Sequence, residues 1–278
     1  MDYKTILVHA DLSRHADARV DLAARLAVEH GAHLIGAAMT GLSRFVVSAG
    51  RPFAPGSIEA GCFAPLDTLA TRALRQFAQV AARHGLTAEK RLVRDQADEA
   101  LARLARFADL VVMSQDDPDE ALGEQPTRLP ESVILAQARP VLVVPRAGCR
   151  GPRFDKVLLA WDGGKEAAFA IAASLPLLRH AAAVTIAAFH PDEAAEAERP
   201  PDIPDLERYL LRHGVRSEVT LRRPAPDPGA ALLALAAELG TDLLVMGCYG
   251  HSRFHELILG GASKTVLADT TLPVLMAH

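Results

Sequence analysis

Short runs of apolar residues alternate along this chain with longer stretches in which apolar residues recur every three or four positions. The short runs are typical of strands buried on both faces, and the longer stretches are typical of helices. The first half contains predicted strands near 4–10, 33–39, 89–94, 108–114 and 141–145, and predicted helices near 14–30, 67–84, 96–106 and 130–137. The second half contains predicted strands near 155–161, 184–190, 216–222, 242–247 and 273–277, and predicted helices near 165–180, 203–213, 228–239 and 262–268. This alternation predicts an α/β fold with a mainly parallel sheet and helices on both faces.

The two halves share one order of elements because the sequence repeats itself. The matching segments are 4–11 (KTILVHAD) with 155–162 (DKVLLAWD), and 108–113 (ADLVVM) with 241–246 (TDLLVM). Segments 113–140 and 246–273 align without a gap, since each runs 27 residues from its methionine to its proline. Two copies of one α/β unit explain these matches.

The repeat predicts two domains, residues 1–145 and 154–278, each with five strands. Residues 146–153 (RAGCRGPR) are short, basic and rich in helix and strand breakers, as expected of a linker. Residues 41–65 form an insertion that is longer than most connections in a compact domain. We interpret it as a cover for apolar surface on the first domain, and a lid or partner-binding loop is the alternative.

A glycine pattern follows the apolar run 243–246 in the second copy: Gly247-x2-Gly250-x9-Gly260-Gly261. A helix is predicted directly after it, so the segment combines a strand end, a glycine-rich loop and a helix N-terminus. Glycines let the backbone approach an anion without a Cβ in the way, and the first amides of a helix can bind phosphate oxygens. The pattern therefore predicts a nucleotide site.

At this point the chain resembles a tandem member of the universal stress protein family. The resemblance rests on the strand-end aspartate Asp162 in Ala160-Trp-Asp-Gly-Gly164 and on the glycine spacing, and the repeat extends it to almost the whole chain. It implies two open sheets resembling those of adenine nucleotide α-hydrolases, paired as an internal dimer. It also implies a stress-response regulatory protein that binds ATP or another adenine nucleotide, with or without magnesium, in its C-terminal domain.

The resemblance implies a set of nucleotide-binding residues in the second copy. They are Ala160, Asp162, Phe189, Met246, Gly247, Gly250, Gly260, Gly261, Ala262 and Ser263. Asp162 could accept hydrogen bonds from adenine or ribose, while the simpler alternative is an N-cap of the following helix. Met246 and Phe189 would flank the base, although ordinary core packing is favoured for Phe189. Arg253 and Lys264 could neutralise phosphate charge or could be solvated surface residues.

One position departs from the family pattern. Where the family carries serine or threonine after the third glycine, this chain has Gly261. Ser263 could substitute, but two positions along a helix turn the side chain by about 200°. Losing one neutral hydrogen bond costs about 1 kcal/mol, or roughly fivefold in affinity. We therefore expect weaker binding rather than none.

The first copy lacks the glycine loop. Ser114, Asp117 and Thr127 stand where the second copy has its three spaced glycines, and residues 115–120 (QDDPDE) carry four carboxylates. Negative charges crowded at a phosphate site cost more than one helix N-terminus returns. The first copy is therefore predicted not to bind nucleotide, although it keeps the strand-end Asp11.

Composition narrows the classes of function further. The formal charge of −4 gives no reason to expect nucleic acid as a partner, and no apolar run is long enough to span a membrane. No signal-peptide pattern is seen at the start, and the three separated cysteines suggest reduced thiols, so we expect a soluble cytoplasmic protein. Cys248, His251 and His255 lack a convincing fourth ligand, so no metal site is predicted.

Two alternatives to a nucleotide-binding regulator stay open. One is an interaction module of the same fold that has lost useful nucleotide affinity. The other is an adenylating enzyme, which is disfavoured because the turn at 162–165 (DGGK) lacks the serines such enzymes carry. Slow ATP hydrolysis or autophosphorylation is left open, although no recognisable general base indicates it. An unknown protein partner and a homodimer are also left open.

Overall fold

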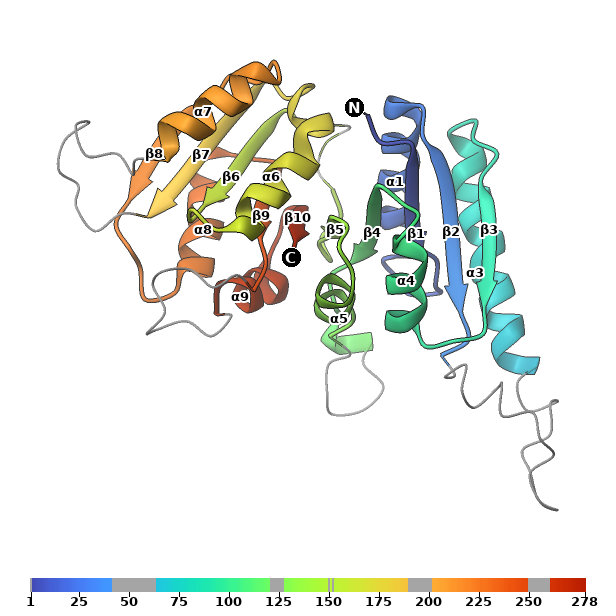
Figure 1. Cartoon of the computed structure of the whole chain (residues 1–278). Helices are drawn as coiled ribbons and strands as arrows, with labels where there is room; N and C mark the ends of the chain where they lie inside the picture. Colours follow the sequence, from blue (N-terminus) through green and yellow to red (C-terminus); the bar gives the residue numbers. More distant parts are fainter. Residues whose placement is uncertain are drawn as a thin grey trace. The chain divides into compact units, whose positions relative to one another are not determined.

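Each half of the chain folds around a group of mainly parallel strands, as the computed structural model in Figure 1 shows. The structure describes residues 2–41, 64–120, 128–149, 151, 153–189, 202–249 and 261–278. Tyr3–Arg139 forms the N-terminal unit and Pro140–His278 forms the C-terminal unit. The division falls before the domain boundary predicted at residue 145, because the last strand of the first repeat joins the sheet of the C-terminal unit.

Four parallel strands make the sheet of the N-terminal unit, in the order β3-β2-β1-β4. Helices α1 and α3 pack together on one face, and α4 and α5 pack together on the other (Figure 1). The strands are β1 (Thr5–His9), β2 (His33–Met39), β3 (Glu89–Val93) and β4 (Leu110–Ser114), and the helices are α1 (Ala16–His30), α3 (Ala64–Arg83), α4 (Ala97–Ala105) and α5 (Leu129–Ala136), with a 3-10 turn at Pro118–Glu120.

Six strands make the sheet of the C-terminal unit, in the order β5-β10-β9-β6-β7-β8. All these pairs are parallel except β5 with β10, where Val143 faces Val274 in an antiparallel ladder. The strands are β5 (Val141–Val144), β6 (Lys156–Trp161), β7 (Ala183–Phe189), β8 (Glu218–Arg222), β9 (Leu243–Gly247) and β10 (Val274–Ala277), and the helices are α6 (Lys165–Leu178), α7 (Ile203–Arg212), α8 (Pro228–Leu239) and α9 (Gly261–Asp269).

The predicted α/β fold is confirmed, and each predicted strand and helix has a counterpart within a few residues. The apolar runs form strands that are buried on both faces, as in β4 and β10. Glycines end helices where the pattern stops: Gly31 after α1 and Gly240 after α8 both adopt positive φ. Most of the predicted insertion 41–65 lies outside the described residues.

A repeated aspartate ties the first strand of each repeat to the fourth. Asp109 accepts the backbone N–H groups of Lys4 and Thr5, and Asp242 likewise accepts those of Asp155 and Lys156. These bonds lie at the amino ends of the strands, at the opposite end from the predicted ligand site. The aspartates in the two repeat segments therefore hold the sheet together rather than bind ligand.

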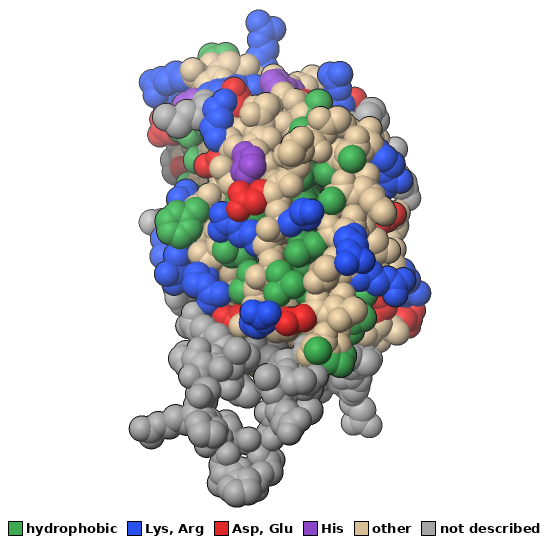
Figure 2. All heavy atoms as spheres, turned by 90° about the vertical axis from the view of Figure 1, so that its right-hand side faces the viewer, with side chains coloured by type: hydrophobic (Ala, Val, Ile, Leu, Met, Phe, Trp, Pro, Cys, Tyr) green, Lys and Arg blue, Asp and Glu red, His purple; other side chains and the backbone are tan. Residues whose placement is uncertain are grey.

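Close packing of helices on the sheet depends on small residues. A Cβ at Gly36 in β2 would lie 2.5 Å from the ring of the fully buried Phe77 in α3. On the side that carries α3 and β3, hydrophobic side chains lie among lysines and arginines (Figure 2), and Leu69 and Leu92 are among the exposed ones. None of the described helices is long and apolar enough to cross a membrane.

Candidate functional site

The first strand of the second repeat, β6, lies at a reversal of strand order. β6 pairs with β7 on one side and with β9 on the other. In open α/β sheets, the crevice beyond the carboxyl ends of two such strands is where ligands bind. Asp162 directly follows β6 and Gly247 ends β9, so the structure brings these two predicted residues to the same edge of the sheet.

Asp162 is exposed and is not the N-cap of α6. Its Oδ1 accepts the backbone N–H of Gly164 at 2.8 Å, while Gly164 itself is the N-cap residue and no side chain caps the helix. Gly163 supports this turn with a φ of +74°. The turn fixes the carboxylate at the mouth of the sheet edge through one oxygen. The N-cap alternative for Asp162 is therefore wrong.

Gly247 ends β9 where the first turn of α6 crosses the sheet. A Cβ at this position would lie 2.5 Å from the backbone nitrogen of Ala167 and 2.7 Å from the carbonyl carbon of Glu166. Backbone atoms cannot move aside as a flexible side chain can. The first glycine of the pattern is therefore required by contact between strand and helix, in addition to any role toward a ligand.

The loop after β9 has described ends that lie close together. Tyr249 adopts a left-handed conformation with φ +54°, which is uncommon outside glycine. Its backbone N–H donates to the hydroxyl of Ser263 at 3.3 Å, in the first turn of α9. Strain of this kind often marks a functional site. The other predicted loop residues, Gly250 and Gly260 with His251, Arg253 and His255, lie outside the described residues.

Ser263 is 5% exposed, and its hydroxyl faces the backbone of Tyr249. In this structure the serine joins the two ends of the loop. Gly261 and Ala262 open α9, so their amides belong to the first turn, which has no partners within the helix. Lys264 is exposed on the same helix.

The remaining predicted residues lie on the strands around the site. Ala160 faces Ala187 in the β6–β7 ladder, and Met246 faces Met276 in the β9–β10 ladder. Met246 is 4% exposed, whereas Phe189, at the end of β7, is half-buried. Met246 is therefore a core residue of the sheet.

Sequence reasoning missed Glu166, a carboxylate in the first turn of α6. Its side chain is 7% exposed, and the nearest cation is the ammonium of Lys165 at 3.5 Å. The Cβ of Glu166 packs against Gly247, so this residue lies beside the end of β9. Glu166 aligns with His15 of the first repeat. The ring of His15 contacts Asp117 in the loop after β4, so the two residues occupy equivalent places beside the sheet edge.

The equivalent edge of the N-terminal unit is occupied by a side chain of the protein. The guanidinium of Arg19, only 1% exposed, reaches the carboxyl ends of both β1 and β4. Its three acceptors, each at 2.8 Å, are the His9 carbonyl, Asp11 Oδ1 and Ser114 Oγ. Burial alone would raise the pKa of Asp11, but Arg19, helped by His9 and Ser13, holds it well below its usual range. Burial lowers the pKa of His9 to about 4, with Asp11 opposing and Arg19 adding to the shift.

Two carboxylates of the acidic segment 115–120 pair with basic side chains of the N-terminal unit. The guanidinium of Arg14 contacts Asp117 and Asp119, and His15 Nε2 lies 2.6 Å from Asp117 Oδ2. The hydrogen bond from His15, together with Arg14, holds the pKa of Asp117 well below its usual range. The sequence-based reason for excluding nucleotide here, open repulsion by four carboxylates, is therefore corrected: Asp117 and Asp119 are paired, and Arg19 fills the edge between Asp11 and Ser114.

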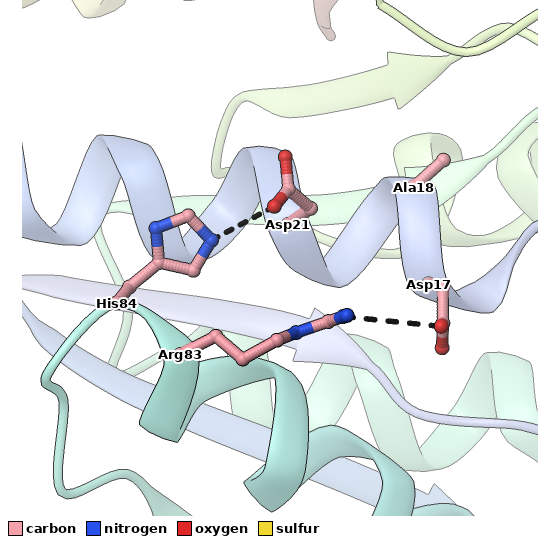
Figure 3. Close-up of a pocket in the computed structure, with 5 residues that line it drawn as sticks. All are labelled: Asp17, Ala18, Asp21, Arg83 and His84. Carbon is pink, nitrogen blue, oxygen red and sulfur yellow. Dashed lines mark hydrogen bonds and ion pairs between the residues drawn. The ribbon is translucent and has the colours of Figure 1, made fainter.

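Two further polar clusters lie within the described residues of the N-terminal unit. His15, Asp117 and Glu120 bring three ligand atoms within 4.8 Å of one another, but Arg14 already bonds to two of these residues. Figure 3 shows a hollow between α1 and α3 in which His84 pairs with Asp21 at 2.8 Å and Arg83 with Asp17 at 3.9 Å. In both clusters the charged groups satisfy one another.

Comparison with known proteins shows sequence similarity to one family. Residues 153–278 match the sequence model of the universal stress protein family. The universal stress protein Slr1230 of Synechocystis sp. is 31% identical over 153 residues, which cover 52% of this chain and 49% of that protein. The match thus spans about half the length of this relative.

Solved structures share the fold over nearly the whole chain. A universal stress protein from Archaeoglobus fulgidus is 18% identical with a TM-score of 0.71, covering 98% of this chain and 95% of that one. A putative universal stress protein from Pseudomonas aeruginosa is 16% identical with a TM-score of 0.62, covering 99% and 93%. These identities support the fold alone. With the sequence match, they lead to one conclusion: the C-terminal part, residues 153–278, is similar in sequence to the universal stress protein family, and the chain shares the fold of solved members.

Proposed function

We propose that the protein is a stress-response regulator whose C-terminal unit binds ATP or another adenine nucleotide. The observation that carries the proposal is the convergence of three features at the β6–β9 edge. They are the exposed carboxylate of Asp162, the side-chain-free end of β9 at Gly247, and a loop that returns to the N-terminus of α9 beside Tyr249.

The chemistry of these groups matches the two ends of a nucleotide. The first-turn amides of α9, at Gly261 and Ala262, would donate to phosphate oxygens, as helix N-termini commonly do. The free oxygen of Asp162 would accept a hydrogen bond from the base or the ribose. Magnesium bound with the nucleotide would offset the negative charge of the phosphates and of the nearby Asp162.

Asp162→Asn tests the role of the carboxylate. Asparagine keeps an oxygen for the N–H of Gly164, so the turn should survive, but the charge is lost and the second position becomes a donor. A charge-assisted hydrogen bond contributes about 1.5–3 kcal/mol, so the dissociation constant for MgATP should rise roughly ten- to hundredfold. Calorimetric titration of the purified protein measures this, and Asp205→Asn, a surface aspartate paired with Arg208, is the charge-matched control.

Nucleotide content separates the alternatives. Denatured wild-type protein should release an adenine nucleotide on chromatography, or the apo protein should bind added MgATP. No released nucleotide and no heat of binding at millimolar ATP would indicate the interaction module, for which the exposed Leu69 and Leu92 offer one apolar surface. Rapid pyrophosphate release with a cosubstrate would indicate an adenylating enzyme.

A further inference from the structure

The N-terminal unit holds a buried cation at the place where the C-terminal unit has its candidate site. Arg19 is nearly inaccessible to solvent, yet it lies at the carboxyl ends of β1 and β4, where strand order reverses. Its Nε, Nη1 and Nη2 each donate to a different acceptor, so the planar group is bound along its whole edge. The guanidinium is thus bound at this edge in the way that a separate small cation would be bound.

The C-terminal unit lacks this side chain at the matching position. Arg19 follows Asp11 by eight residues, and Ala170 follows Asp162 by eight residues. Seven buried positions of the two helices coincide in this alignment: Ala16, Arg19, Val20, Ala23, Ala24, Leu26 and Ala27 in α1 correspond to Ala167, Ala170, Ile171, Ser174, Leu175, Leu177 and Leu178 in α6. The two helices therefore present residues 19 and 170 to the same part of their sheets.

The acceptors also differ between the two units. Asp11 bonds to Arg19 and is mostly shielded, whereas Asp162 stays exposed. Ser114 offers a hydroxyl to the guanidinium, whereas its counterpart Gly247 has no side chain. The edge of the N-terminal unit is filled by the planar guanidinium of Arg19. The edge of the C-terminal unit presents the exposed Asp162 and has no side chain at Gly247.

We propose that Arg19 is a built-in ligand of the N-terminal unit, and that arginine at position 19 and alanine at position 170 decide which unit can take a ligand from solution. Without the Arg19 side chain, the His9 carbonyl, Asp11 and Ser114 form a site for a free guanidinium or amidinium cation. The part concerning residue 19 is independent of the proposed nucleotide function, while the part concerning residue 170 rests on it.

Chemical rescue tests the role of Arg19. Arg19→Ala should lower the melting temperature by about 5 °C or more, because Asp11 loses its buried partner. Guanidinium or n-propylguanidinium, added at roughly 1–50 mM against sodium chloride of equal ionic strength, should raise it again with saturation. Arg25→Ala is the matched control, since Arg25 lies on the same helix and pairs with Asp21. Neither it nor the wild type should be stabilised.

A wild-type melting temperature for Arg19→Ala, or no stabilisation by either cation, would overturn the proposal. If the variant folds only with guanidinium present, the proposal is supported. If it folds under neither condition, NMR of the wild type decides. Slowly exchanging guanidinium N–H signals from Arg19 that MgATP leaves unchanged support it, and signals that exchange freely with water contradict it.

The reciprocal graft tests position 170. Ala170→Arg should place a guanidinium beside Asp162 and weaken MgATP binding at least hundredfold, while Ala168→Arg, at an exposed position of α6, should leave it unchanged. Equal affinities of the two variants would refute the role of position 170. If the wild type itself binds no nucleotide, the proposed function fails, yet guanidinium rescue still decides whether Arg19 is a built-in ligand.

Discussion

At the scale of single residues, Gly247 and Ser114 lie at equivalent ends of β9 and β4 but have different structural roles. Ser114 supplies a hydroxyl to the buried guanidinium of Arg19. Gly247 has no space for even a Cβ, because backbone atoms of α6 lie 2.5 Å from where it would be. A difference of one hydroxymethyl group at a strand end therefore separates an edge filled by the protein from an edge lined by backbone.

His9 predicts a pH dependence of the N-terminal unit. The unfolded chain takes up a proton on this histidine near pH 6.5, but the folded unit does so only near pH 4. Stability is therefore present above pH 6.5 and is lost as the pH falls from 6.5 to 4, by roughly 3 kcal/mol in total. Asp11 and Asp117 do not add to this window, because their lowered pKa values move their losses to more acidic pH.

Urea unfolding of wild type and His9→Gln at pH 7, 6 and 5 measures the effect, with hydrogen exchange reporting on peptides of the N-terminal unit. The wild type should lose more stability than the variant over this range, since glutamine does not titrate. Parallel pH profiles for the two proteins would show that His9 is not buried in its neutral form.

At the scale of elements, α8 and α9 meet through a glycine and a hydrogen bond. A Cβ at Gly229 would lie 2.7 Å from the carbonyl oxygen of Ala262, so the first turns of the two helices touch. Asp227 is the N-cap of α8 through Ala230, and its second oxygen accepts the hydroxyl of Thr265 at 3.0 Å. The start of α8 thus fixes the start of α9, the helix proposed to bind phosphate.

Thr265→Val removes this bond with little change in shape. The N–H of Ala230 and then the hydroxyl of Thr265 lower the pKa of Asp227, so the variant should raise that pKa toward its usual value. Less firmly held amides in α9 should weaken MgATP binding about two- to fivefold. Two-dimensional NMR and calorimetry measure the two effects, with the exposed Thr271→Val as control. An unchanged pKa of Asp227 would show that the bond does not form in solution.

At the scale of the whole molecule, the first four strands of each repeat pair in the same order, β3-β2-β1-β4 and β8-β7-β6-β9, but the two repeats differ in what fills the reversal point of the sheet. Arg14, His15 and Arg19 lie just before or within the first turn of α1 and pair with Asp117 and Asp11 of the N-terminal unit. The C-terminal unit has Lys165, Glu166 and Ala170 at these places. Both copies therefore keep the same strand scaffold, but only the second copy has no arginine filling the edge at the reversal point.

The chain should accordingly bind one adenine nucleotide, not two. Calorimetric titration with MgATP at protein concentrations above the dissociation constant gives the stoichiometry, and Asp11→Asn should leave it at one per chain. Saturation at two nucleotides per chain would contradict the occupancy of the N-terminal edge by Arg19. Asp162→Asn should weaken this single binding event without changing the stoichiometry.

Much of the fold and part of the site could be predicted from the sequence. Strand and helix positions follow from local apolar periodicity and from stop signals such as Gly31 and Gly240. The repeat placed Asp162 and Gly247 at strand ends, because parallel strands of one sheet end at a common edge. These features depend on neighbouring residues or on the comparison of the two copies, which a sequence displays directly.

Only the tertiary structure decided which groups meet across the chain. Arg19 looks like one more charged helix residue until it reaches Ser114, 95 positions away. The contact of Gly247 with α6 and the antiparallel pairing of β5 with β10 likewise join distant segments. Hydrogen bonding and close packing depend on distances between atoms, and these distances exist only after the sheet has assembled. The amino-acid pattern determined the scaffold, and the folded contacts determined which edge is filled.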